Sequence, residues 1–126
     1  MKILVLEDDP RIARCLQREL TRAGYQVCAT RLCRTARAWN HKVDVAVLDI
    51  ELPDGSGVDI ARELLAHGTA RRVIFFSSAR DQQLLRSAAE HGEVLTKSGD
   101  FAPLITALAS KSDVRLRRRR LGPARR

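Results

Sequence analysis

An apolar run that passes directly into an acidic turn lies near the middle of the chain: Val45-Ala46-Val47-Leu48-Asp49-Ile50-Glu51-Leu52-Pro53-Asp54-Gly55. Its first four residues are apolar without interruption, which is typical of a strand buried on both faces of a parallel sheet. Similar apolar runs occur at 3–6, 73–76 and 94–95, with a weaker candidate at 25–29. The sequence therefore predicts five strands.

Segments with the apolar spacing of amphipathic helices separate these strands and follow the last one, at 12–23, 32–39, 61–65, 84–89 and 101–108. Gly24, Gly68 and Gly92 each follow a helical segment, where a glycine that ends a helix is expected. Strands joined by single helices run parallel with right-handed crossovers. We therefore expect an α/β fold with a five-stranded, parallel, doubly wound sheet.

The chain has 126 residues and a formal net charge of +8, but the charge is unevenly distributed. Residues 111–126 contain 8 Lys or Arg and 1 Asp, whereas residues 1–110 contain 15 Lys or Arg and 14 Asp or Glu. This division predicts one folded domain over 1–110, long enough to bury a core, and a basic, disordered tail or linker over 111–126. Such a tail is suited to weak, salt-dependent contact with nucleic acid.

Neither a membrane protein nor a disulfide-stabilised protein is indicated. The longest apolar runs are four residues, far below the roughly 20 that a spanning helix needs, and the amino terminus lacks the pattern of a secretion signal. Cys15, Cys28 and Cys33 form no Cys-x-x-Cys pair, which argues against a zinc site or a disulfide framework. We expect a cytoplasmic protein without a membrane span.

Polar side chains follow four of the five predicted strands. They are Glu7, Asp8 and Asp9 after the first, Asp49 and Glu51 after the third, Ser77 and Ser78 after the fourth, and Thr96, Lys97 and Ser98 after the fifth. Ligands of doubly wound sheets bind beyond the carboxyl ends of the strands. The first turn is acidic where a nucleotide-binding turn is rich in glycine, so bare nucleotide binding is not expected.

The acidic residues at this edge predict a divalent cation. Two carboxylates such as Asp8 and Asp49, placed about 4 Å apart at an effective dielectric near 20, repel each other by about 4 kcal/mol. Mg²⁺ (or Mn²⁺) relieves this repulsion, because it accepts one or two carboxylates together with water and phosphate oxygens. We expect Asp8 to bind the metal directly, Glu7 to hold it directly or through water, and the backbone carbonyl of Glu51 to be a further ligand.

A metal, a single aspartate, a hydroxyl and a lysine together suit the attack of a carboxylate on a phosphoryl group. In this scheme Asp49 is the nucleophile, Ser78 hydrogen-bonds the phosphoryl oxygens and Lys97 pairs with them. Ser77 is the competing hydroxyl. We favour Ser78 because Ala79 follows it.

The motifs that carry these residues resemble those of response-regulator receiver domains of two-component signalling: Leu6-Glu7-Asp8-Asp9, Leu48-Asp49-x-x-Leu52-Pro53-Asp54-Gly55-x-Gly57, Ser78-Ala79 and Thr96-Lys97. The resemblance covers about residues 1–110. It implies a flavodoxin-like (βα)5 fold with strand order 2-1-3-4-5. It also implies that Asp49 accepts phosphate from a histidine kinase or phosphotransfer protein, with Mg²⁺ held by Glu7, Asp8, Asp49 and the Glu51 carbonyl.

The resemblance further implies a phosphorylation-controlled module that assists its own phosphotransfer and autodephosphorylation, and not a conventional multiple-turnover enzyme. With no effector domain in these residues, we expect a stand-alone receiver. Its output would pass to a downstream protein through the face formed by the fourth helix, fifth strand and fifth helix. Val94 stands where the family has an aromatic switch residue, so we expect this output to depend on Ser78 and on backbone movement.

Other functions remain open at this point. A small phosphohydrolase of the haloacid-dehalogenase type also forms an aspartyl-phosphate, but its second Asp is replaced here by Glu51 and no room remains for a substrate cap. A regulator anchored to nucleic acid by its tail is another alternative. A degenerate receiver that binds partners without phosphate is disfavoured by the intact site residues, which are Asp8, Asp49, Ser78 and Lys97.

Overall fold

The computed structural model describes residues 1–110, and these form a single α/β layer structure. The five strands of the main sheet are β1 (Lys2–Leu6), β2 (Gln26–Thr30), β3 (Val43–Leu48), β6 (Ala70–Ser77) and β7 (Glu93–Thr96). All neighbouring pairs are parallel, in the order β2-β1-β3-β6-β7. This order is the expected 2-1-3-4-5, counted over the main sheet.

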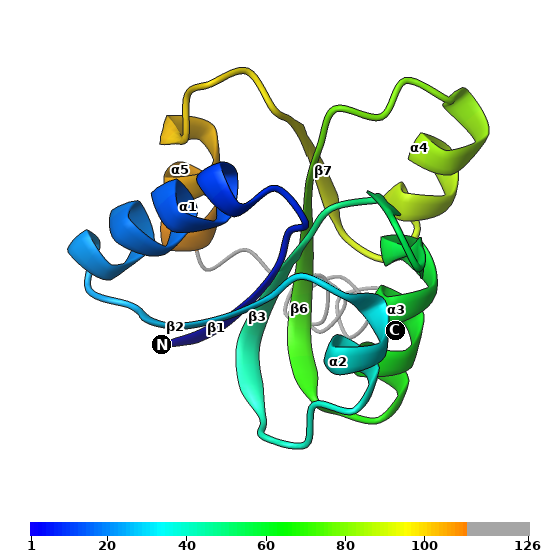
Figure 1. Cartoon of the computed structure of the whole chain (residues 1–126), viewed down its shortest axis with the longest axis horizontal. Helices are drawn as coiled ribbons and strands as arrows, with labels where there is room; N and C mark the ends of the chain where they lie inside the picture. Colours follow the sequence, from blue (N-terminus) through cyan, green and yellow to red (C-terminus); the bar gives the residue numbers. More distant parts are fainter. Residues whose placement is uncertain (111–126) are drawn as a thin grey trace, which may run out of the picture.

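Helices cover both faces of the sheet, as Figure 1 shows. They are α1 (Pro10–Arg22), α2 (Cys33–Arg37), α3 (Gly57–Ala66), α4 (Gln82–Ala89) and α5 (Ala102–Ala109). One apolar cluster joins the sheet to α1 and α5, and a second joins it to α2, α3 and α4. The doubly wound architecture expected from the alternation of strands and helices is confirmed.

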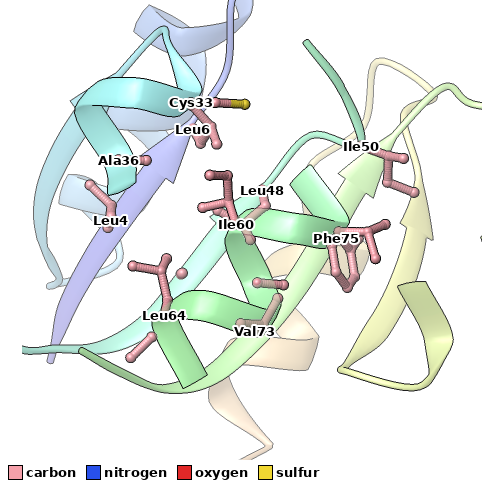
Figure 2. Close-up of a cluster of buried hydrophobic side chains, with 14 of the residues drawn as sticks. Leu4, Leu6, Cys33, Ala36, Leu48, Ile50, Ile60, Leu64, Val73 and Phe75 are labelled. Atoms are coloured by element: carbon pink, nitrogen blue, oxygen red, sulfur yellow. The ribbon is translucent and has the colours of Figure 1, made fainter. Parts of the chain in front are cut away.

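The central strands carry the core because both of their faces are covered. Val45, Ala46, Val47 and Leu48 of β3 are all buried, in agreement with their uninterrupted apolar pattern. In Figure 2, Leu4 of β1 and Leu48 of β3 lie in the cluster with Ile60 and Leu64 of α3. Alternate residues of the same strands belong to the cluster beneath α1 and α5.

Some element boundaries differ from the sequence expectation. α2 has only five residues, and a short antiparallel pair, β4 (Glu51–Leu52) with β5 (Gly55–Ser56), forms between β3 and α3. α3 begins at Gly57, four residues before the first apolar position used to predict it. Among the described helices, none has the length and apolar character needed to cross a bilayer. The basic tail or linker predicted at 111–126 lies outside the described residues.

The start of α3 packs tightly against the end of β3. The Gly57 amide donates to the Ile50 carbonyl at 2.7 Å, and a Cβ added to Gly57 would lie 1.7 Å from the Asp49 carbonyl oxygen. Only glycine permits this approach. The start of α3 therefore lies directly against the backbone of Asp49 at the carboxyl edge of the sheet.

Candidate functional site

Three carboxylates meet at the carboxyl edge of the sheet. Glu7 and Asp8 follow β1 and Asp49 follows β3, and one carboxylate oxygen from each lies within 4.8 Å of the others. The parallel pairing of β1 with β3 causes this proximity, because Leu6 and Leu48 are in register and the next residues leave the sheet together. Glu7 is 1% exposed, Asp49 is 7% exposed and Asp8 is half-buried.

Lys97 bridges two of these carboxylates. Its Nζ lies 2.6 Å from Glu7 Oε1 and 2.8 Å from Asp49 Oδ2. Its backbone amide donates to the Ser77 carbonyl at 2.9 Å, which fixes the residue at the end of β7. Burial alone would lower the pKa of Lys97, but its hydrogen bonds to Asp49 and Glu7 outweigh burial, so the pKa is raised. Lys97 therefore carries a positive charge in the cleft at neutral pH.

Backbone amides hold the remaining carboxylate oxygens. Asp49 Oδ1 accepts from the Ile50 amide at 2.8 Å, and Glu7 Oε2 accepts from the Asp9 amide at 3.1 Å. Burial raises the pKa of Glu7 above its ordinary value, against the opposing effects of Lys97 and the Asp9 amide. The cleft thus assembles three carboxylates around one lysine, and its negative charge is only partly compensated.

The donor set fits a hard divalent cation. Every side-chain ligand is a carboxylate oxygen, which Mg²⁺ and Mn²⁺ prefer, and no His or Cys belongs to this group within the described residues. The excess negative charge in a largely buried cleft gives a physical reason for a cation to bind. Glu51 lies in β4, directly beyond this cluster, and its side chain is exposed. Its part as a backbone ligand stays a prediction.

The two candidate serines occupy different environments. Ser77, the last residue of β6, is 4% exposed, and its Oγ accepts from the Ala79 amide at 3.1 Å. Ser78 is exposed and lies just beyond the strand. The buried hydroxyl is therefore engaged in closing the turn, whereas the Ser78 side chain is open to solvent.

Two neighbouring aspartates have structural roles. Asp9 is the N-cap of α1, as its position before Pro10 predicts, and its side chain accepts from the Arg11 amide at 2.9 Å. Asp54, in the turn between β4 and β5, caps α2. Its carboxylate accepts from the Cys33 amide at 2.8 Å and the Arg34 amide at 3.1 Å. No local signal reveals this contact, because cap and helix are about 20 residues apart in sequence.

The fold and the cleft together define a class: a doubly wound, flavodoxin-like protein with an acidic cluster and a lysine at the carboxyl edge of its sheet. The chain belongs to the response regulator receiver domain family, whose model matches residues 3–109. It is thus the receiver domain of a two-component system, a phosphorylation-signalling module. The resemblance seen in the sequence motifs is confirmed, and the phosphohydrolase alternative is not favoured.

Similar proteins include transcriptional regulators. The transcriptional regulatory protein KdpE of Mycobacterium tuberculosis is 41% identical over 81 residues, which are 63% of this chain and 35% of KdpE. The probable transcriptional regulatory protein SilR of Salmonella typhimurium is 36% identical over 109 residues, 83% of this chain and 48% of SilR. The chain spans about a third to a half of the length of these curated relatives.

Solved structures of the family share the fold. The response regulator TrrA of Thermotoga maritima, in complex with Mg²⁺ and BeF, matches with a TM-score of 0.78 and 27% identity, over 86% of this chain and 96% of that one. The similarity at this level concerns the whole layered domain. The metal and the beryllium fluoride are properties of the TrrA structure.

Proposed function

We propose that Asp49 accepts a phosphoryl group from a histidine kinase or phosphotransfer protein, in a reaction that depends on Mg²⁺. The observation that carries this proposal is the position of the Asp49 carboxylate. It lies in one cleft with Glu7 and Asp8, within 2.8 Å of the Lys97 ammonium. The Ile50 amide orients its other oxygen.

In the proposed step, a carboxylate oxygen of Asp49 attacks the phosphorus of a phosphohistidine. The P–O bond forms as the P–N bond breaks, and the donor imidazole keeps the electron pair and takes up a proton. Lys97 already holds Asp49 Oδ2, so its ammonium moves only a short way to pair with the transferred phosphoryl oxygens. The Ser78 hydroxyl donates a hydrogen bond to the same oxygens.

Glu7, Asp8, Asp49 and the Glu51 carbonyl are the groups proposed to hold the metal. Mg²⁺ supplies charge neutralisation between the carboxylates and the incoming phosphoryl group. Lys97 alone leaves an excess of negative charge beside Asp49, which would repel an anionic donor. This imbalance supports a requirement for the cation.

The product changes the charge of the cleft. A phosphoryl group carries about −1.5 to −2 at neutral pH, and it displaces the present pairing of Lys97 with Glu7 and Asp49. We propose that the resulting shift reaches a downstream protein through α4, β7 and α5. Val94, half-buried in β7, has no ring to reorient, so movement of Ser78 and of the backbone carries the signal. Slow autodephosphorylation would then reset the module.

The direct test is incubation with acetyl phosphate and Mg²⁺, followed by intact-protein mass spectrometry. We expect one phosphoryl group to be added, and no addition with EDTA or in Asp49→Asn. Asp44→Asn is the matched control, because Asp44 lies in β3 at the end opposite to the one that Asp49 follows. This variant should be modified like the parent. An adduct that persists in Asp49→Asn would overturn the proposal.

A further inference from the structure

An open pocket of about 630 Å³ lies between β7 and α5, on the edge of the sheet away from β2. β7 contributes Glu93 and Leu95, α5 contributes Pro103 and Thr106 among others, and Asp100 and Ser110 come from the residues that flank α5. The α5 positions are spaced by three or four residues, so they share one face of the helix. The cleft of Glu7, Asp8 and Asp49 contributes none of the lining residues, so this is a separate surface.

The pocket carries exposed negative charge at two points. The Glu93 side chain is 51% exposed, and Asp100 is exposed while its Oδ1 caps α5 by accepting from the Ala102 amide at 2.9 Å. The nearby cation is Arg72, whose Nη2 donates to the Ala107 carbonyl at 2.8 Å and lies 3.9 Å from Glu93 Oε1. Arg72 is therefore shared between the Glu93 carboxylate and the Ala107 carbonyl.

The last described residue of the chain lines this pocket, and the most basic part of the sequence follows it. Ser110 lines the pocket and is followed directly by residues 111–126, which contain 8 Lys or Arg and 1 Asp. Arginines occupy position 115 and positions 117–120. Five residues of extended chain span at most about 18 Å, and the eight residues of α5 are about 12 Å long. The arginines are therefore within reach of both acidic points.

We propose that the arginine-rich segment 115–120 docks in this pocket and pairs with Glu93 and Asp100. Exposed ion pairs each contribute little to binding, so a free peptide of this sequence would bind weakly. A short tether changes this balance, because it gives the segment an effective concentration in the millimolar range. The docked segment covers the side of α5 and β7 that a partner would otherwise contact, so partner and segment compete.

NMR spectroscopy of the full chain tests the proposal, with one variant for each side of the contact. Arg117→Glu/Arg118→Glu reverses charge in the segment. Glu93→Gln/Asp100→Asn removes charge from the pocket, and asparagine at 100 keeps a side chain able to cap α5. Asp59→Asn/Glu63→Gln is the matched control, since it removes two acidic charges from α3, on the other face of the sheet.

At about 0.01 M salt, we expect the amide signals of β7 and α5 to differ between the parent and the segment variant. This difference should vanish when the same comparison is made in the Glu93→Gln/Asp100→Asn background. It should also vanish at about 1 M salt, where the screening length falls to about 3 Å. In the Asp59→Asn/Glu63→Gln background it should persist. Identical β7 and α5 signals in the parent and the segment variant would overturn the proposal. So would shifts that gather at the acidic cleft, or ordering of the segment only after DNA is added.

Discussion

Lys97 determines how the charges of the cleft are balanced, because its ammonium contacts both Glu7 and Asp49. Sequence reasoning could predict the cluster of Glu7, Asp8, Asp49 and Lys97, since each residue directly follows a strand that is easy to recognise. It could not predict which carboxylate Lys97 contacts in the absence of phosphate. This choice depends on small differences in the positions of the side-chain atoms, and the order of residue types in the sequence does not reveal them.

The two serines after β6 should have separable roles. Ser77→Ala removes a buried acceptor from the Ala79 amide, so we expect a loss of about 1 kcal/mol in the free energy of unfolding and little change in phosphorylation. Ser78→Ala should leave the unfolding free energy nearly unchanged and alter the rate of phosphorylation by acetyl phosphate or the lifetime of the product. Urea denaturation and mass spectrometry measure the two effects. The reverse assignment of effects would show that Ser77 is the hydroxyl that contacts phosphate.

Cys33 should be the least reactive of the thiols at mildly alkaline pH. Burial raises the pKa of its thiol from 9.0 to about 11, and a hydrogen bond with Asp54 acts in the same direction. A rise of two units lowers the thiolate fraction about 100-fold at pH 8, so alkylation should be slow and should accelerate as the pH rises towards 11. Peptide mapping after iodoacetamide treatment checks this, with the exposed Cys28 as internal reference. Modification of both thiols at equal rates would contradict the burial of Cys33.

At the scale of elements, the sequence predicts the main strands and helices because uninterrupted apolar runs and helical apolar spacings mark the segments that pack in the core. It does not predict the pair β4 and β5, whose four residues lie outside the main sheet and have no apolar periodicity. α2 is shorter than its apolar spacing suggests, and its capping residue is Asp54, which is distant in sequence. Contacts of this kind follow from the tertiary fold and leave no local signal.

Two glycines at close backbone contacts should differ in their effect on the site. A Cβ at Gly57 would meet the Asp49 carbonyl, and a Cβ at Gly92 would lie 2.1 Å from the Val73 carbonyl. We expect Gly57→Ala and Gly92→Ala each to destabilise the protein by about 1–3 kcal/mol. Gly57→Ala should also slow phosphorylation, because the clash moves the backbone of the acceptor residue.

Thermal denaturation measures the loss of stability in each variant. Phosphorylation rates are then compared at a temperature where both variants are folded, so that slower phosphorylation is not a result of unfolding. Equal phosphorylation of the parent and Gly57→Ala would show that this close approach does not position Asp49.

At the scale of the whole molecule, the cleft joins segments that are far apart in the chain, so ligands bound there should stabilise the entire domain. A cation at ten times its dissociation constant adds about 1.4 kcal/mol to the unfolding free energy, or about 7 °C in Tm for a domain of about 100 residues. We expect Mg²⁺ to raise the Tm of the parent and to have little effect on Asp8→Asn. Without metal, Asp8→Asn should be at least as stable as the parent, since it removes one of three clustered carboxylates.

Differential scanning calorimetry with Mg²⁺ and with EDTA measures both effects. An equal rise of Tm in parent and variant would place the cation elsewhere.

Phosphorylation is proposed at one carboxylate, that of Asp49, which would become an acyl phosphate. Borohydride reduces an acyl phosphate to the alcohol, so treating the phosphorylated protein and mapping its peptides locates the modified residue directly. We expect homoserine at position 49 and unchanged aspartate at positions 8, 9 and 44. Homoserine at any of those three positions, or phosphate retained on a histidine with position 49 unmodified, would contradict it.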